Sequence, residues 1–460
     1  MSNTKKTNQQ IEALFHPDSI AIVGLPRELK TGKLYLIALQ DQGYRGKIVG
    51  VNPNADEIDG IKCYPSVADI PGKVDMAIVL TPYHHTLPVI EECAQKGVKG
   101  VVLFTAGYKE TGTMEGAQRQ AKIVAVANKV GMRLIGPNGM GLYAPESGLS
   151  FFPNLSRQSG PISLISHSGS LANIICGMGA SYGLFFNKAV SLGNECDLNS
   201  IDFFNYYAQD PNTDIISAYI EGIADGDGFL KAVRNAALKK PVIIWKVGLN
   251  PEGQSAAHSH TGALSSPKEI WDGVAAQSRI TTVSGFEMWI DTMMGFSLLP
   301  KLKGNRVAII TGPGGFGVAA AEACGKENLK LAQISNETRS LLNKVIPPTG
   351  TSLRNPIDVG MTASLLIEIY IESIKAVAAD PGVDVVLLIG IGLSVETNEK
   401  FSAAVISTQR TSGKPFLVVE VPNSEYSFSD VFSKAGIPFF KSSERALSTY
   451  TRVLDYYTNH

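Results

Sequence analysis

Two histidines lie two residues apart in a stretch of small residues, and an imidazole in such surroundings can carry a phosphoryl group. The stretch covers residues 253–267 and places His258 and His260 among Gly, Ser, Ala and Thr. Small neighbours let backbone N–H groups approach a phosphate, and the hydroxyls of Ser259 and Thr261 can donate hydrogen bonds to it. We therefore expect a loop that presents histidine. An idle Ser/Gly-rich surface loop fits the stretch by itself at least as well.

A Ser/Gly turn at residues 166–172 is a second candidate for anion binding. It follows the apolar run 161–165 and leads into an apolar helical pattern. The free N–H groups and the dipole at the start of a helix favour negative charge there, and Ser168 and Ser170 add hydroxyl donors on either side of Gly169. An ordinary N-cap serine explains the same pattern. A serine hydrolase is disfavoured, because no glycine stands two residues before Ser168.

Glu221 is a third candidate, because it comes at the end of the apolar run 215–220. A carboxylate at the end of a buried strand is costly unless it is paired or used. Such a carboxylate can hold one ring nitrogen of His260 and leave the other nitrogen free as a nucleophile. The alternative is that Glu221 caps a turn or pairs with a lysine.

Short apolar runs that alternate with helical patterns must position these groups. In the first third of the chain, runs at 19–24, 47–53, 75–82, 100–105 and 132–137 alternate with patterns such as 87–96 and 115–130. This alternation predicts a doubly wound α/β domain, which binds its ligand beyond the carboxyl ends of its strands. The residues that we expect at this nucleotide site are Gly24, Arg27, Lys30, Asn52, Pro53, Thr81, Pro82, Ala106, Gly107 and Asn138.

The rest of the chain predicts two further α/β sheets. With 460 residues and 44% hydrophobic content, the chain is long enough for about three domains, which we place at 1–147, 148–300 and 301–460. The glycine-rich turn at 312–317 is a weak nucleotide signal, and a tight structural turn explains it as well. The turn after the first run lacks G-x-G-x-x-G, which disfavours a dinucleotide dehydrogenase.

Composition narrows the class of partners. Lys plus Arg number 41 and Asp plus Glu number 42, so net charge gives no case for nucleic acid or a membrane surface. The 5 cysteines are scattered without metal-type spacing, which predicts reduced thiols and no metal site. The N-terminus reads as a polar tail without an apolar signal, and no long uncharged apolar run follows it. We expect a soluble cytoplasmic protein.

Motifs across the chain resemble one family. The runs at 16–24, 43–48, 51–53 and 136–141 are similar to the CoA-binding domain of nucleoside-diphosphate-forming acyl-CoA synthetases, a superfamily that includes succinyl-CoA synthetase. The Ser-His-Thr-Gly-Ala-Leu run at 259–264 looks like the phosphohistidine loop of that family. The resemblance implies an α/β fold in which a Rossmann-like CoA-binding domain precedes two flavodoxin-like domains. It also implies that His260 is the nucleophile and Glu221 its partner. His167 stands where the family commonly has Gln, and His258 stands where it has a small residue.

The resemblance further implies an incomplete enzyme. No Walker A motif occurs, and no segment remains for an ATP-grasp domain. The chain thus resembles an α chain that works with an ATP-grasp β chain, as α2β2, with ATP/ADP and Mg²⁺ on the partner. The implied reaction joins a small carboxylic acid to CoA, with release of ADP and phosphate, through an acyl phosphate and a phosphohistidine. The alternatives are a non-catalytic CoA-binding regulatory or scaffold protein, and a dehydrogenase.

Overall fold

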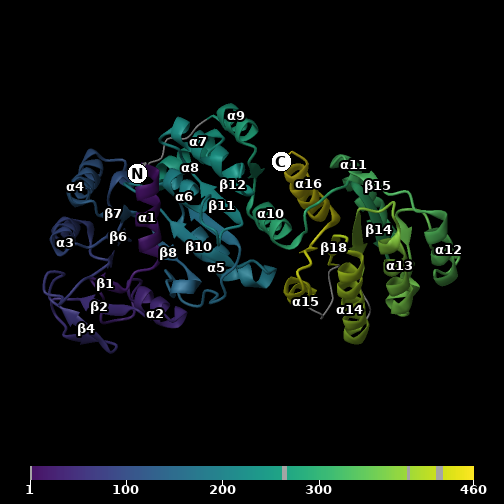
Figure 1. Cartoon of the computed structure of the whole chain (residues 1–460), viewed down its shortest axis with the longest axis horizontal. Coiled ribbons are helices and arrows are strands. Elements are labelled where there is room, and N and C mark those ends of the chain that lie inside the picture. The colour runs from purple at the N-terminus through teal and green to yellow at the C-terminus, as the bar shows by residue number, and fades with distance from the viewer. Residues whose placement is uncertain (1–2, 262–266, 391–393, 421–427, 460) are drawn as a thin grey trace. The chain divides into compact units, whose positions relative to one another are not determined.

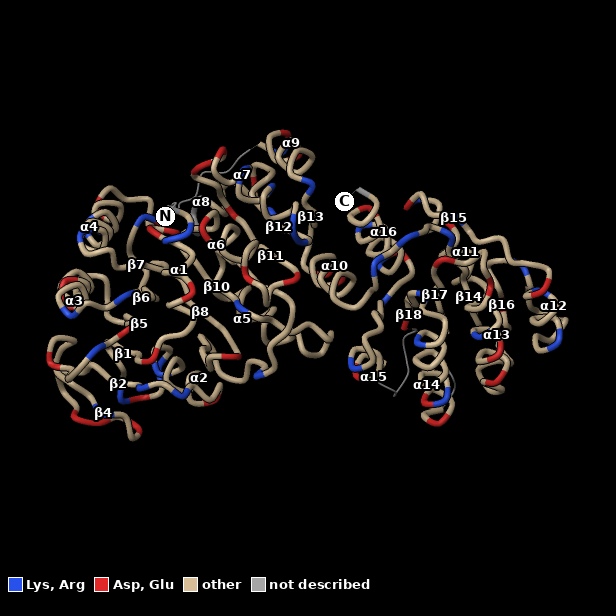
Figure 2. Tube along the Cα trace, viewed as in Figure 1, with Lys and Arg blue, Asp and Glu red and all other residues tan. Residues whose placement is uncertain are grey.

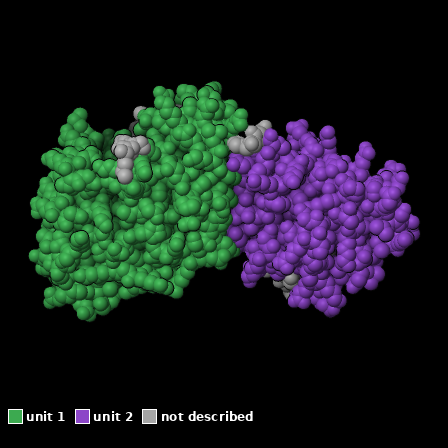
Figure 3. All heavy atoms as spheres, in the orientation of Figure 1, with its two compact units in different colours: residues 1–180, 185–284 green, residues 181–184, 285–460 purple. Residues whose placement is uncertain are grey.

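A computed structural model describes residues 3–261, 267–390, 394–420 and 428–459. Within these ranges the side chains of residues 3, 258–261 and 459 are not described. The described residues form three mainly parallel sheets with helices on their faces (Figure 1), so the predicted α/β class is confirmed. The chain divides into two compact units (Figure 3), Met1–Ala180 with Phe185–Ser284, and Ser181–Leu184 with Gly285–His460.

The first sheet has the strand order β3-β4-β2-β1-β5-β6-β7, and all its pairs are parallel except β3 with β4. Its central strand consists of five buried residues, as the apolar run predicted. The strands are β1 (Ser19–Val23), β2 (Lys47–Val51), β3 (Glu57–Ile58), β4 (Ile61–Tyr64), β5 (Met76–Val79), β6 (Gly100–Leu103) and β7 (Arg133–Ile135), with helices α2 (Lys33–Gln42), α3 (Tyr83–Lys96) and α4 (Met114–Val130).

The N-terminal segment is not a polar tail, as we expected, but helix α1 (Asn3–Phe15). Its apolar residues Ile11, Leu14 and Phe15 have helical spacing and are buried. The ring of Phe15 stacks on that of Tyr206, with 5.9 Å between the ring centroids. The expectation was wrong because the first ten residues are polar, whereas the apolar face lies in the last five.

The second sheet has the strand order β13-β12-β11-β9-β10-β8, and β8 is its only antiparallel member among the described strands. The ends of β9, β10, β11 and β12 therefore lie along one edge. The elements are β8 (Gly141–Tyr143), β9 (Ile162–Ser166), α5 (Gly169–Met178), β10 (Phe186–Ser191), α6 (Ser200–Tyr207), β11 (Ile215–Ile220), α7 (Gly226–Ala237), β12 (Val242–Lys246), α8 (Pro251–Thr261), α9 (Lys268–Ser278) and β13 (Thr281–Val283).

The third sheet lies in the second unit and has the order β15-β14-β17-β18-β19, with β16 paired to β14. All of its pairs are parallel. Its strands are β14 (Arg306–Thr311), β15 (Lys330–Leu331), β16 (Ile357–Asp358), β17 (Val385–Ile389), β18 (Phe416–Val419) and β19 (Phe439–Phe440), and its helices are α10 (Phe286–Leu298), α11 (Gly314–Lys326), α12 (Asn336–Val345), α13 (Ile367–Ala379), α14 (Val395–Ser412), α15 (Phe428–Ala435) and α16 (Ser443–Asn459).

Acidic and basic residues both occur along the surface helices, as α4 and α14 illustrate (Figure 2). Pairs spaced by one helical turn link some of them, such as Glu396 with Lys400 at 2.9 Å. Among the described helices, each is too short or too polar to span a bilayer. The predicted three-domain division at 147 and 300 stays a prediction.

Candidate functional site

Glu221 is held by its backbone at the end of β11. Glu221 is only 3% exposed, so it is a buried carboxylate at a strand end, as we expected from the sequence. The peptide N–H of Glu221 donates to Nδ1 of His167 at 3.2 Å. Its carbonyl oxygen accepts a hydrogen bond from Nζ of Lys246 at 2.9 Å. Residues at the ends of the two neighbouring strands therefore fix both polar atoms of the Glu221 backbone.

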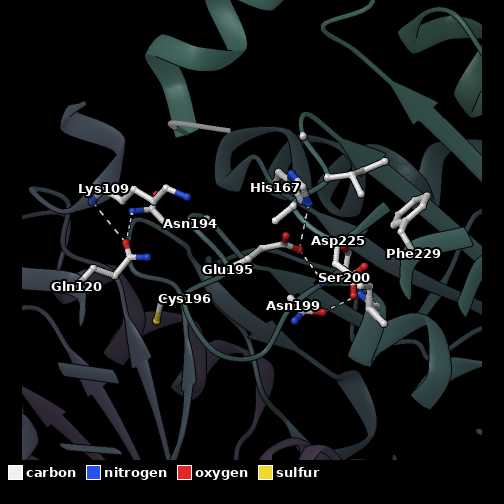
Figure 4. A pocket seen from close by; sticks show the side chains of 15 residues that line it. Lys109, Gln120, His167, Asn194, Glu195, Cys196, Asn199, Ser200, Asp225 and Phe229 are labelled. Atoms are coloured by element: carbon white, nitrogen blue, oxygen red, sulfur yellow. Dashed lines mark hydrogen bonds and ion pairs between the residues drawn. The ribbon is translucent and has the colours of Figure 1, made fainter. Parts of the chain in front are cut away.

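His167 also contacts a glutamate that sequence reasoning did not single out. Its Nε2 lies 3.1 Å from Oε1 of Glu195, and the same oxygen accepts the N–H of Ser200 at 2.6 Å. Burial opposes a charge on His167, but the charge and hydrogen bond of Glu195 outweigh it and raise the His167 pKa. Burial likewise opposes the charge on Glu195, yet His167 and Ser200 lower the Glu195 pKa below its ordinary value. Buried His167 and half-buried Glu195 thus form a pair (Figure 4).

The His167–Glu195 pair faces a cavity of about 330 Å³ at the carboxyl ends of the second sheet. Figure 4 shows Glu195 in the middle, Phe229 of α7 on one side, and Lys109, Gln120 and Asn194 on the other. Gly222, the residue after Glu221, lines the same cavity. The Asn194 Nδ2 donates to Gln120 Oε1 at 3.1 Å, whereas its buried Oδ1 has no partner among the described residues. The cavity thus offers both apolar surface and polar groups to a small ligand.

The Ser/Gly turn is the start of α5. Ser168 occupies the N-cap position, and its Oγ accepts the N–H of Leu171 at 3.4 Å, so the N-cap interpretation describes its contact. A Cβ on Gly169 would lie 2.7 Å from Cγ of Met140, so a side chain there would collide. Ser170 is exposed. A phosphate at this helix start stays a prediction for all three residues.

The described part of the histidine stretch up to Thr261 is helical where we expected a loop, because α8 runs through Pro251–Thr261. Proline suits the first position of a helix. Asn250 precedes it, and its Oδ1 accepts the N–H of Gly253 at 2.8 Å, as a capping residue does. We expected a loop because of the small residues, and we did not take Asn250 and Pro251 as the start of a helix.

Helix α8 packs close to Glu221. A Cβ on Gly248 would lie 3.5 Å from Cβ of Ala257 and 3.4 Å from the carbonyl oxygen of Glu221. The backbone of His260 lies about one turn beyond Ala257. The same helix contacts the short turn η1 (Lys109–Thr111) of the first sheet. The side chains of His258, Ser259, His260 and Thr261 lie outside the described residues, so their roles stay predictions.

Lys246 is a second residue that sequence reasoning missed. It ends β12 and is 4% exposed, and its Nζ also donates to the carbonyl of Val247 at 2.5 Å. Burial lowers its pKa from 10.5 to about 8, although the charge of Glu221 acts in the opposite direction. The signal was available, because Lys246 follows the apolar residues 242–245 just as Glu221 follows the apolar run 215–220.

The first sheet brings Gly24, Asn52 and Thr81 together at the ends of its three central strands. Gly24 has φ 84, and a Cβ on it would lie 3.1 Å from Cγ2 of Thr81. Asn52 Nδ2 donates to the carbonyl of Leu25 at 2.9 Å and so holds the turn after β1. The buried Oγ1 of Thr81 has no partner among the described residues. This bare turn and unsatisfied hydroxyl fit a polar ligand that lies close to the backbone.

The other predicted residues of the nucleotide site are spread around this edge. Gly107 has φ 112, and its carbonyl accepts Nε of Arg119 at 2.9 Å. Asn138 also has a positive φ, of 59, and its N–H donates to the carbonyl of Thr105. The residues on the open surface are Arg27, Pro53, Pro82, Ala106 and Lys30, of which Lys30 pairs with Glu28 at 3.3 Å. Ligand contacts by these residues stay predictions.

Three family models match the chain in succession. A CoA binding domain matches residues 18–145, a succinyl-CoA ligase like flavodoxin domain matches 159–296, and a ligase-CoA domain matches 307–418. This order confirms the expected fold, in which a CoA-binding domain precedes flavodoxin-like domains. Within the described residues, no group of three or more His, Cys, Asp or Glu side chains can hold a metal ion.

Relatives and a solved structure extend over most of the chain. The α subunit of Pyrococcus furiosus acetate–CoA ligase [ADP-forming] II is 34% identical over 94% of this chain and 95% of its own length. The Methanocaldococcus jannaschii acetate–CoA ligase [ADP-forming] is 37% identical over 76% of this chain, which spans only 49% of that relative. The Candidatus Korarchaeum cryptofilum acetyl-coenzyme A synthetase 1, solved with phosphate and ADP, superposes with a TM-score of 0.85 at 31% identity, over 98% of this chain and 97% of that one. The chain therefore belongs to the family of ADP-forming acetate–CoA ligases, and the resemblance seen in its motifs is confirmed.

Proposed function

We propose that this protein is the α chain of an ADP-forming acid–CoA ligase. The observation that carries the proposal is the reciprocal coverage with the P. furiosus α subunit, which matches this chain almost from end to end. The reaction is carboxylate + CoA + ATP ⇌ acyl-CoA + ADP + phosphate. The longer M. jannaschii relative has about as much additional sequence as this chain covers, which is consistent with a second component supplied by another chain.

The chemistry divides into three transfers. The imidazole of His260 attacks the γ-phosphorus of ATP, so that a P–N bond forms as the P–O bond to ADP breaks. A carboxylate oxygen of the acid then attacks that phosphorus and releases the imidazole. Finally, the CoA sulfur attacks the acyl carbon, phosphate leaves, and the thiol proton ends on phosphate. Splitting the reaction in this way replaces one difficult step by easier ones.

The residues of the second sheet suit these transfers. Glu221 orients the imidazole of His260 from the strand end that His167 and Lys246 hold. The start of α5, with Ser168, Gly169 and Ser170, binds the phosphoryl group, assisted by the hydroxyls of Ser259 and Thr261. Support for a nearby acid site comes from the cavity that Gly222 and His167 line.

CoA occupies the edge of the first sheet. The bare backbone at Gly24 and the unsatisfied Oγ1 of Thr81 support a nucleotide that lies against this turn. Arg27 and Lys30 are exposed cations on the same turn and suit the CoA phosphates. The contact between α8 and η1 brings the histidine helix to the same edge of this sheet.

A separate ATP-grasp β chain completes the enzyme. It binds ATP or ADP with Mg²⁺, and two copies of each chain form an α2β2 assembly in the cytoplasm. The name of the P. furiosus relative, a subunit alpha, supports a partner chain. The acid is a small carboxylic acid.

To test this proposal, the chain is purified through a tag together with its bound partner, and phosphorylation of the chain in this complex is measured. With radiolabelled ATP and Mg²⁺, acid-labile and base-stable phosphate should appear on this chain, and His260→Asn should abolish it while CoA binding persists. Label that persists in His260→Asn would contradict the assignment. A chain that binds CoA but gives neither label nor ADP release with a panel of acids would favour the regulatory alternative.

A further inference from the structure

A continuous chain of polar contacts joins the cavity to the backbone of Glu221. The N–H of Ser200 donates to Glu195 Oε1 at 2.6 Å, and this oxygen lies 3.1 Å from Nε2 of His167. Nδ1 of the same imidazole accepts the peptide N–H of Glu221 at 3.2 Å. These contacts tie residues that are far apart in sequence to one strand end. His167 is the central member, with one nitrogen for each neighbour, and Figure 4 shows its contact with Glu195.

The partners of His167 define its tautomer. A peptide N–H can only donate, so Nδ1 must offer its lone pair to Glu221. The proton of the neutral ring is then on Nε2, where it faces the Glu195 carboxylate. A second proton would put an N–H on Nδ1, directly against the N–H of Glu221, and the bond between them would be lost. The arrangement therefore requires a neutral imidazole.

Glu195 is held in place at a conformational cost. Its backbone has φ 52, which is in the left-handed region that a non-glycine residue adopts only at an energetic cost. Strain of this kind concentrates at functional sites. Glu195 is also only 16% exposed in its side chain, next to the 3% of His167, so the pair sits inside the protein and not on its surface.

We propose that His167, oriented by Glu195, is a positioning residue for Glu221, whose backbone N–H it holds through an unprotonated Nδ1. The inference rests on the proposed function, in which the Glu221 carboxylate orients His260. Lys246 holds the carbonyl of Glu221 from the other side. Together the two contacts fix the peptide from which the Glu221 side chain extends. A displacement of about 1 Å at a catalytic group can cost about a hundredfold in rate.

The pair also makes positioning depend on pH. Among the described residues, Glu195 in the turn after β10, Glu221 directly after β11 and Lys246 at the end of β12 are the charged groups that act on His167. The two carboxylates favour a second proton on the ring, whereas Lys246 and burial oppose it. As the pH falls, that proton reaches Nδ1 and releases the N–H of Glu221. Phosphoryl transfer should then decline.

Glutamine separates these two effects, because its amide supplies an acceptor and a donor but does not titrate. In the tagged complex, we measure the initial rate of ATP-dependent labelling of this chain between pH 5.5 and 9, in roughly half-unit steps chosen to span the titration of histidine. His260 must be neutral to attack phosphorus, so in every variant the loss of one proton is needed for activity. In the wild type His167 must lose a second proton. A plot of log rate against pH should therefore have a slope of about 2 on the acid side in the wild type and about 1 in His167→Gln.

The expected rates distinguish positioning from folding. At pH 8, His167→Gln should stay within about threefold of the wild type, whereas His167→Ala should lose about 10- to 100-fold, with CoA affinity unchanged in both. In Glu195→Gln, the pH at which His167 takes up its second proton should fall by about one unit or more, because the carboxylate that favours this proton is gone. His16→Gln is the matched control, because His16 faces Glu12 at 3.2 Å on the surface, and its profile should match the wild type.

A second measurement needs neither the partner nor activity. With ¹⁵N-histidine, the His167 resonances, assigned by their absence in His167→Gln, should show an unprotonated Nδ1 and a protonated Nε2 at pH 8. An Nδ1–H tautomer, or equal pH slopes in the wild type and His167→Gln, would overturn the inference. If the wild type acquires no phosphate at all, the proposed function fails instead, and the tautomer result still decides the contact at Glu221.

Discussion

The turns β9–α5 and β14–α11 share one design but differ in what surrounds them. Each joins a buried parallel strand to a helix that begins with glycine. At the first turn, β9 pairs with β11, which is followed by Glu221, and β11 pairs in turn with β12, which ends in Lys246. At the second, β17 is followed by Gly390, where a Cβ would lie 2.7 Å from the hydroxyl of Tyr370. A buried tyrosine thus fills the space beside the second turn.

The second turn also carries its own anion. A Cβ on Gly314, the first residue of α11, would lie 2.5 Å from Oδ2 of Asp358. The Oδ1 of Asp358 accepts the N–H of Gly360 at 2.9 Å, which fixes the carboxylate near the helix start. Tyr370 is held by the carbonyls of Ile310, at 3.1 Å, and Ile389. In the third sheet, side chains therefore fill the space at the helix start, whereas in the second sheet this space is left available to a ligand. Side chains at the strand ends make the difference.

The largest difference between the two turns is expected when one carboxylate is neutralised at each. Glu221→Gln should lower phosphoryl transfer by about 10²- to 10⁴-fold, because the amide orients His260 poorly, and CoA affinity should not change. Asp358→Asn should leave the rate within about twofold. Rapid-quench labelling and calorimetric titration of CoA measure the two quantities. A comparable loss of rate in both variants would show that the second turn also serves the reaction.

The pH dependence of stability gives the next largest effect. Folding lowers the pKa of Lys246 from 10.5 to about 8, so between these values the unfolded chain binds the extra proton. The contribution of Lys246 to the free energy of unfolding should be constant below pH 8 and rise from there to pH 10.5, by an amount on the order of 3 kcal/mol. Lys246→Met should lack this rise relative to the wild type. Urea denaturation at several pH values tests it, and parallel curves for the two proteins would refute the buried charge.

Glycine substitutions compare the two helix starts directly. Gly169→Ala should cost about 1–3 kcal/mol, because the new methyl group meets Met140. Gly315→Ala, in the second residue of α11, meets nothing within 4 Å and should be neutral or stabilising by up to about 1 kcal/mol. Urea denaturation of both variants gives the difference. Equal stability would mean that Met140 moves aside without cost.

The smallest effect concerns the anion at α11. Asp358→Ser removes the carboxylate near Gly314 and should lower stability by about 0.3–1 kcal/mol, which is the usual value of a charge at a helix start. Added phosphate should restore part of the loss if it can take the vacated position. Thermal unfolding of the wild type and the variant with and without phosphate measures this. Identical phosphate responses would show that the second turn stays closed without Asp358.

The sequence predicted the strands and the position of Glu221 at a buried strand end, because both depend on local pattern, whereas the role of Glu221 stays a prediction. Apolar runs located β1, β9 and β11, and the cost of a charge at a strand end singled out Glu221. Helix α1 was not predicted because its apolar residues lie only in its last five positions. Helix α8 was not predicted because we took the small residues as a sign of a loop and did not consider Asn250 as a capping residue. The His167–Glu195 contact could not be read locally, because only the order of strands in the sheet brings residues 167, 195 and 221 together.

The edge strand β8 determines where the protein can be cut into fragments that each hold a complete sheet. Residues Gly141–Tyr143 follow the first sheet in the chain but pair with β10 of the second. A cut between residues 147 and 148 would therefore leave the second sheet without its border, and the N–H and C=O groups of β10 would be open to pairing with another molecule. A fragment intended to hold the second sheet alone should start before Gly141, or it is expected to aggregate.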